Sequence, residues 1–281
     1  MNYRHAYHAG NFADVVKHAV LARIVAHLKE KPAAFRAIDT HAGAGAYDLA
    51  GPEASRTGEW RDGIGKLVGA NLAPAERALL APYLEAIAAF NAGDLKVSPG
   101  SPLLLQHWLR PQDRLIACER EPNAARALGA RLRGDKRARA VVIDGYTALN
   151  AYVPPKERRG LVLIDPPFEA RDEFDRLAQG LAAAHRKWPT GIYTLWYPIK
   201  DAADTQQFGR RISRLGIPRT LQAELSLAGR RGLGGSGLIL VNPPWRLESE
   251  LAVLLPALLR VLDGSAPGAG RTLTRWLAGE G

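Results

Sequence analysis

The sequence predicts an α/β fold built on a doubly wound, mostly parallel sheet. Short apolar runs rich in β-branched residues alternate with stretches of helical spacing over most of the 281 residues. Acidic residues follow four successive runs, and a Pro-Pro pair ends the fourth of them. Ligands of open α/β sheets bind at the carboxyl ends of strands, so we look for the functional site there.

The first fifty residues predict an arm, a helix and the first strand. Residues 1–10 are rich in Tyr, Arg and His, and Asn11 is a good N-cap for a helix that we expect to run to Lys29. The first strand is expected at 35–38. Residues 51–98 then interrupt the alternation with several glycines and one amphipathic stretch. We expect a mostly helical insertion subdomain there, with 1–50 and 99–281 forming the main domain.

The alternation resumes after the insertion. A helix is expected from 103 to 108, and the later helices at 123–132, 146–152, 172–188 and 205–215. The expected strands are 114–118, 140–143, 161–164, 191–197, 220–227 and 237–241. The last two strands, joined through a glycine-rich segment, predict an antiparallel C-terminal hairpin that completes the sheet. Residues 264–270 have the composition of a loose linker.

Composition favours a nucleic-acid partner. The net charge is +10, from 38 basic and 28 acidic residues, which suits a polyanion better than a membrane. Cys118 is the only cysteine, so no intramolecular disulfide is possible and a reducing cytoplasm is expected. No signal peptide or membrane-length apolar run is seen, and His5 and His8 alone do not make a metal set. We therefore expect a cytoplasmic protein without membrane or metal.

The fourth strand ends in Asp165-Pro166-Pro167-Phe168, which suits binding of the amino group of a flat heterocycle. The Asp165 carboxylate and the Pro166 carbonyl can accept both hydrogens of an amine such as adenine N6 and so localise its lone pair. Phe168 offers a stacking face for the base. The alternative is structural: Asp165 would cap the next helix and Phe168 would pack in the core.

A second copy of this pattern occurs at Asn242-Pro243-Pro244-Trp245. Only one of the two can be the reacting centre, and the upstream strands decide between them. A glycine loop, Gly43-Ala44-Gly45, follows the first strand, Glu119 the second and Asp144 the third. This ordered series before the fourth strand is the layout of class I S-adenosylmethionine-dependent methyltransferases with a D/N-P-P-aromatic motif. The later copy is therefore interpreted as structural.

The glycine loop does not complete a dinucleotide fingerprint. The third glycine of G-x-G-x-x-G is replaced by Asp48, whose charge would repel a pyrophosphate. An acid at the end of the second strand is placed to bind ribose hydroxyls in either class of protein. The loop alone is equally compatible with a tight strand–helix turn.

The chain as a whole resembles the RlmJ family of 23S ribosomal RNA adenine-N6 methyltransferases. The resemblance covers Tyr3 to about Leu247. The segments that carry it, besides the motif at 165–168, are Tyr3-Arg4-His5, 8–11, 14–18, 39–45, 56–59, 99–102, Asp144-Gly145 and Trp196-Tyr197-Pro198.

The resemblance implies single methylation of one adenine, on free 23S rRNA rather than on assembled ribosomes. It implies S-adenosylmethionine as cofactor, and contacts to it from His18, His41, Ser101, Glu119, Asp144, Gly145 and Asp165. Asp165 would also be the catalytic acceptor, assisted by Pro166 and Phe168, and Tyr3 would contact the RNA. Tyrosine is common where this chain has Phe168, so any role of a hydroxyl is lost.

The residues alone leave other possibilities open. His18 would by itself be read as part of a half-exposed helix face, whereas His41 in the glycine loop favours a ligand. A DNA adenine or protein amine methyltransferase could share the tetrapeptide. A nicotinamide-dependent oxidoreductase could use the glycine loop, and a basic RNA-binding protein without catalysis would share the charge. We expect a monomeric RNA adenine N6-methyltransferase.

Overall fold

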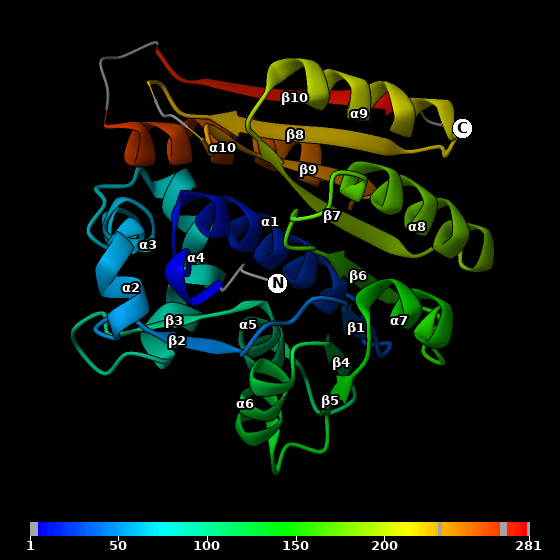
Figure 1. The fold of residues 1–281 in the computed structure, drawn as a ribbon, viewed down its shortest axis with the longest axis horizontal. Coiled ribbons are helices and arrows are strands. Elements are labelled where there is room, and N and C mark those ends of the chain that lie inside the picture. Colours follow the sequence, from blue (N-terminus) through cyan, green and yellow to red (C-terminus); the bar gives the residue numbers. More distant parts are fainter. Residues whose placement is uncertain (1–4, 230–231, 265–268, 280–281) are drawn as a thin grey trace.

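A computed structural model describes residues 5–229, 232–264 and 269–279. Its centre is an eight-stranded sheet (Figure 1). In spatial order the strands are β10 (Arg271–Ala278), β8 (Thr220–Ser226), β9 (Gly235–Val241), β7 (Ile192–Ile199), β6 (Gly160–Ile164), β1 (Arg36–Asp39), β4 (Arg114–Glu119) and β5 (Ala138–Val142).

The five strands from β7 to β5 are parallel, and the remaining pairs are antiparallel. The chain first builds outward from β1 to β4 and β5, and then returns to place β6 on the other side of β1. The strand order therefore reverses between β1 and β6. In such sheets the carboxyl ends of strands at this reversal form a crevice for ligands.

Helices cover both faces of the sheet, because successive strand residues point to opposite sides. Leu161 and Leu163 of β6 join a core with the helices of one face, and Val162 and Ile164 join a core with those of the other. The first face carries α1 (Phe12–Lys29), α4 (Pro74–Ala89), α5 (Ser101–Trp108), α6 (Pro122–Leu132) and α10 (Leu247–Asp263). The second carries α7 (Gly145–Tyr152), α8 (Glu173–Lys187) and α9 (Ala202–Arg214).

Helix α1 is buried on almost all sides. Asn11 caps it as expected, since its Oδ1 accepts from the backbone N–H groups of Ala13 and Asp14, each at 3.0 Å. The helix contacts β9 of the sheet on one side and α4 and α10 on the other (Figure 1). Even its polar residues Asp14, Lys17 and His18 are buried, at 2–4% exposed. The half-exposed helix face suggested for His18 by the sequence is wrong.

Residues 51–98 contribute α2 (Pro52–Thr57), η2 (Glu59–Asp62), α3 (Ile64–Val68) and α4. Strands β2 (Ala46–Asp48) and β3 (Val97–Pro99) pair on either side of this segment. Tyr83 and Ile87 of α4 belong to the same hydrophobic core as α1, and α4 packs on α1, α5 and α10.

The predicted elements are present, with boundaries shifted by a few residues, and β8 and β9 form the expected antiparallel hairpin. The sequence interpretation ended the sheet at Val241 and so missed α10 and β10, an additional antiparallel edge strand. The second Pro-Pro motif is structural, as expected. Since β9 runs antiparallel to β7, Asn242 lies at the opposite edge, where its Nδ2 donates to the carbonyls of Pro189 and Gly191.

Candidate active site

A cleft of about 750 Å³ lies at the carboxyl ends of β1, β4, β5 and β6. Every residue expected from the resemblance to contact the cofactor lines this cleft, as does Pro166; the set is His18, His41, Ser101, Glu119, Asp144, Gly145 and Asp165. Phe168 lines a neighbouring cavity instead. Tyr3 lies outside the described residues, so its place is not given by the structure.

The glycine loop after β1 is joined to the end of β4. The N–H of Gly43 donates to Glu119 Oε2 at 2.8 Å, and the N–H of Glu121 donates to Oε1 at 2.7 Å. Gly43 has a φ of +61°, a conformation that favours glycine. These bonds fix the Glu119 carboxylate at the cleft wall, where its remaining lone pairs can accept hydroxyl donors.

After β5, the turn that carries Asp144 and Gly145 lies close to the loop that carries His41 after β1. Asp144 caps α7 by accepting from the N–H groups of Tyr146 and Thr147, at 3.1 Å each. A Cβ added to Gly145 would lie 2.4 Å from His41 Nε2, so only glycine fits against this imidazole. Asp144, Gly145 and His41 therefore form one continuous wall of the cleft.

His18 and His41, two of the histidines that line the cleft, are neutral near pH 7. Burial and the neighbouring Lys17 lower the pKa of His18 to about 3, and burial lowers that of His41 to about 4. The buried Nε2 of His18 has no hydrogen-bond partner among the described residues. A buried polar atom without a partner is costly, so a polar ligand in the cleft is the natural partner for this nitrogen.

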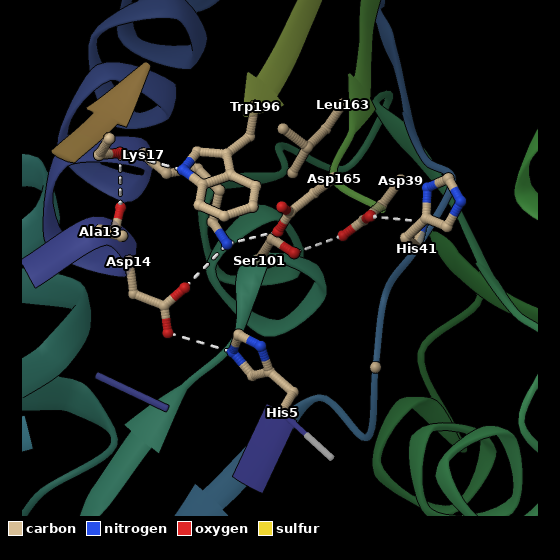
Figure 2. Close-up of polar contacts among 12 residues, drawn as sticks. His5, Ala13, Asp14, Lys17, Asp39, His41, Ser101, Leu163, Asp165 and Trp196 are labelled. Atoms are coloured by element: carbon tan, nitrogen blue, oxygen red, sulfur yellow. Dashed lines mark hydrogen bonds and ion pairs between the residues drawn. The ribbon is translucent and has the colours of Figure 1, made fainter. Parts of the chain in front are cut away.

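Ser101 and Asp39 form a hydrogen bond beneath the cleft floor. The Ser101 hydroxyl donates to Asp39 Oδ2 at 2.6 Å, and the N–H of His41 donates to the other oxygen at 3.3 Å (Figure 2). Asp39 is fully buried, and burial raises its pKa to about 7. Of the four acids at strand ends, Asp39 thus supports the site from below, whereas the other three line the cleft.

An ion-pair network that the sequence interpretation missed centres on Lys17. Its ammonium nitrogen lies 2.8 Å from Asp14 Oδ1 and 2.5 Å from Asp165 Oδ2, and Asp14 Oδ2 lies 3.1 Å from His5 Nε2 (Figure 2). Burial alone would lower the pKa of Lys17, but the two carboxylates raise it above its ordinary value. Lys17 therefore stays charged and holds Asp165 against α1. The signal was a polar cluster, Asp14 to His18, inside an otherwise apolar helix.

A second cavity of about 570 Å³ adjoins the cleft. Asp165 and Pro167 line both cavities, whereas Phe168 and Trp196 line only the second. The Trp196 indole donates to Ser236 Oγ at 3.0 Å and meets the Phe168 ring edge-to-face, with centroids 5.8 Å apart. Asp165 is thus shared between a large polar cleft and a smaller cavity with aromatic walls.

Phe168 has a φ of +49°, a left-handed conformation that is strained for a bulky residue. Strain of this kind persists where the surrounding structure imposes it and is concentrated at functional sites. Here the backbone turn after Pro167 directs the ring toward Phe174 and Trp196. Phe168 is half-buried: it packs against the hydrophobic core of this face and also lines the second cavity.

The described residues contain neither a metal-ligand cluster nor a membrane span. No group of three or more metal-ligating side chains is found among them. None of the helices within the described ranges combines the length and apolar character needed to span a bilayer.

The chain is similar to known proteins over its whole length. A family model described as "Ribosomal RNA large subunit methyltransferase D, RlmJ" matches residues 32–278. Two proteins named "Ribosomal RNA large subunit methyltransferase J" match 100% of both chains: one from Escherichia coli K12 at 40% identity, and one from Haemophilus influenzae at 36%. A crystal structure of a Legionella pneumophila protein superposes with a TM-score of 0.86 at 34% identity, covering 95% of this chain and 98% of the other. On these matches, the chain belongs to the RlmJ family of ribosomal RNA large subunit methyltransferases.

Proposed function

We propose that this protein is an S-adenosylmethionine-dependent methyltransferase that methylates N6 of one adenine in 23S ribosomal RNA. The observation that carries the proposal is the position of Asp165. Its side chain lines the cofactor-sized cleft and the aromatic cavity at their junction. A group at this junction can hold an acceptor amine in one cavity against a donor in the other.

Asp165 and Pro166 are the residues that orient the amine. The carboxylate accepts one N6 hydrogen and the Pro166 carbonyl accepts the other, which turns the nitrogen lone pair toward the cleft. Lys17 keeps the carboxylate fixed while it does so. Holding reactants in the reactive geometry is the largest contribution that a protein can make to such a transfer.

Lys17 also bears on the fate of the released proton. Protonating Asp165 would leave the buried Lys17 ammonium with Asp14 as its one remaining carboxylate partner in the pairs described above. Buried ions that lose a partner are strongly destabilised. We therefore assign Asp165 the role of hydrogen-bond acceptor, and infer that the proton leaves through water.

The cleft residues fit S-adenosylmethionine. This cofactor, when bound, supplies an electrophilic methyl group on a sulfonium centre. Glu119 would accept the ribose hydroxyls, Asp144 and Gly145 would bind the adenine end, and the partnerless His18 nitrogen would bind the polar amino-acid end. Ser101 would act through its backbone N–H at the start of α5, because its hydroxyl is already donated to Asp39.

The second cavity would hold the target base. Phe168 provides a stacking face, worth about 1–3 kcal/mol per base in single-stranded recognition. Trp196 lines the cavity next to Phe168, and its indole N–H is fixed by a hydrogen bond to the Ser236 hydroxyl. The target adenine must leave the RNA stack to enter, at a cost of a few kcal/mol.

The RNA substrate is supported by the printed names of the relatives and by the net charge of +10. We further propose that a monomer acts on free 23S rRNA in the cytoplasm, with Tyr3 contacting the RNA. Extrusion of a base into the second cavity is easier on RNA that is not yet covered by ribosomal proteins.

The decisive experiment transfers labelled methyl groups from S-adenosylmethionine to unmodified 23S rRNA and identifies the product by nucleoside mass spectrometry. We expect N6-methyladenosine, at one site and at about one methyl per rRNA. Label on another nucleoside, on DNA or on protein, or the absence of transfer, would overturn the proposal.

A further inference from the structure

The second cavity has a polar end whose residues the transfer of a methyl group does not use. Besides the aromatic residues, its lining includes His8, Lys200 and Glu59. His8 precedes α1, Lys200 directly follows β7, and Glu59 begins η2. Three segments far apart in the chain thus place two basic side chains at one end of a cavity proposed to hold a nucleobase.

His8 is held by an ion pair with Glu59. The Nδ1 of His8 lies 3.0 and 3.1 Å from the two carboxylate oxygens, and the two side chains are 38% and 32% exposed. Glu59 Oε2 also accepts from Asn11 Nδ2 at 3.1 Å. Because Asn11 caps α1, Glu59 fixes both the imidazole and the start of the helix that carries Lys17.

The surrounding charges favour the protonated form of His8. The hydrogen bond that the His8 imidazolium donates to Glu59 raises the pKa of His8 above its ordinary value. Partial burial opposes this, Asp14 adds to the increase, and Lys200 reduces it. The other charged groups on the cavity wall are His5, Lys17, Asp165 and Glu169. Asp14 and Asp165 share the single positive charge of Lys17, which compensates one of the two carboxylates.

The charge at this end of the cavity therefore depends on pH. With His8 protonated, the His8–Glu59 pair is neutral and Lys200 leaves a net positive charge. When His8 loses its proton, the His8–Glu59 pair becomes more negative by one charge beside Lys200. A nucleotide whose base enters the aromatic end carries a phosphodiester on its sugar, and phosphates bind to basic side chains and are repelled by carboxylates.

Building on the proposed function, we propose that His8 and Lys200 form a binding site for the phosphodiester next to the target adenosine, with Glu59 as the residue that positions His8 and keeps it charged. The site binds RNA most tightly when His8 is protonated. It acts on RNA affinity and not on binding of the cofactor, whose cleft does not include these three residues.

The test measures the dissociation constant of an unmodified 23S rRNA transcript between pH 6 and 9 at several salt concentrations. For the wild-type protein we expect about fivefold weaker binding at pH 9 than at pH 6. The slope of log affinity against log salt should become shallower by about 0.7, the value for one lost contact to single-stranded RNA. His8→Gln should bind at pH 6 as the wild type does at pH 9.

Further variants separate charge from structure. Glu59→Gln keeps a hydrogen-bond acceptor but removes the charge, so it should move the pH midpoint of RNA binding to lower pH. Lys200→Ala should weaken RNA binding at every pH. The matched control is His27→Gln, because His27 forms a similar pair with Glu30 at 3.4 Å at the C-terminal end of α1 and lines neither cavity. The control should behave as the wild type.

Calorimetric titration with S-adenosylmethionine accompanies each variant and should give unchanged affinity. Wild-type levels and pH dependence of RNA binding in His8→Gln or Glu59→Gln would overturn this inference. Failure of the proposed function is a separate result, since the wild-type protein would then transfer no methyl group to the same transcript. If His8→Gln folds poorly, the pH dependence of RNA binding by the wild-type protein and by Glu59→Gln still tests the role of protonated His8.

Discussion

Replacing Lys17 with methionine is expected to destabilise the protein strongly and to abolish methyl transfer. The Lys17 side chain is 4% exposed, and its partners Asp14 and Asp165 are 5% and 12% exposed. Methionine fills a similar volume but leaves two buried carboxylates without their countercharge. Removing one partner of a buried ion pair costs about 3–5 kcal/mol.

This cost is large compared with a typical unfolding free energy of about 5–15 kcal/mol, but the fold should survive. For a chain of this size it corresponds to a fall in Tm of about 6–15 °C. The exposed ion pair of Lys66 with Asp62, 33% and 56% exposed, supplies the control. Lys66→Met should cost about 0–1 kcal/mol.

The pH dependence of the stability loss in Lys17→Met shows whether the buried carboxylates cause it. Burial alone would raise the pKa of Asp14, but Lys17 and His5 hold it well below its ordinary value. A carboxylate with a lowered pKa contributes stability above its unfolded pKa, and this stability is lost as the pH falls through the folded pKa. Without Lys17, burial dominates and folded Asp14 takes up a proton. The penalty of Lys17→Met is therefore largest at pH 8, and it shrinks by up to about 1.4 kcal/mol for each pH unit of acidification.

The assay is guanidinium unfolding of wild type, Lys17→Met and Lys66→Met at pH 8 and pH 5, with methyl transfer measured in parallel. A penalty for Lys17→Met below about 1 kcal/mol, or one of equal size at both pH values, would refute this reasoning. Wild-type turnover in Lys17→Met would contradict the role given to the pair with Asp165.

Asp165→Asn should lower kcat by about 100-fold or more, with a smaller effect on cofactor affinity, because the amine loses a charged acceptor; wild-type turnover in the transfer assay would contradict this. Phe168→Ala should raise the KM for RNA by about 5- to 100-fold through lost stacking, whereas Phe168→Tyr should stay near wild type. Gly145→Ala should weaken S-adenosylmethionine binding in calorimetry, since the new Cβ would lie 2.4 Å from His41 Nε2. Asp39→Asn should stabilise the protein at pH 8 and less so at pH 5. Burial raises the pKa of Asp39 to about 7, so the folded protein loses stability when Asp39 is ionised. At a pH above both pKa values, this loss is about 1.4 kcal/mol for each unit by which the folded pKa exceeds the unfolded pKa. An equal gain in stability at both pH values would show that Asp39 does not titrate in this range.

Much of the fold and the acidic residues of the candidate site follow from local sequence signals, whereas His18, Ser101 and Gly145 were expected from the family resemblance alone. Strand ends are marked by Asp39, Glu119, Asp144 and Asp165, and a parallel sheet brings such ends to one edge. The choice between the two Pro-Pro motifs also follows from order along the chain. The antiparallel direction of β9 then explains why Asn242 lies at the opposite edge.

The remaining features depend on tertiary packing that spacing along the chain does not reveal. Lys17 and His18 are buried because α4 and α10 cover the far side of α1, and α10 itself was missed. Its leucines at 251, 254, 255, 258 and 262 have helical spacing, so a signal for it was present. Strand β10 is an edge strand whose residues are all partly exposed or exposed, which gives a weak apolar pattern. That Ser101 donates its hydroxyl to Asp39 was likewise invisible, because the two residues are 62 positions apart.

The most direct test of the central claim is a crystal structure with a cofactor analogue and adenosine monophosphate bound together. We expect the adenine to stack on Phe168, with N6 within hydrogen-bond distance of both the Asp165 carboxylate and the Pro166 carbonyl. An adenine bound elsewhere, or one whose amino group points away from Asp165, would contradict the account.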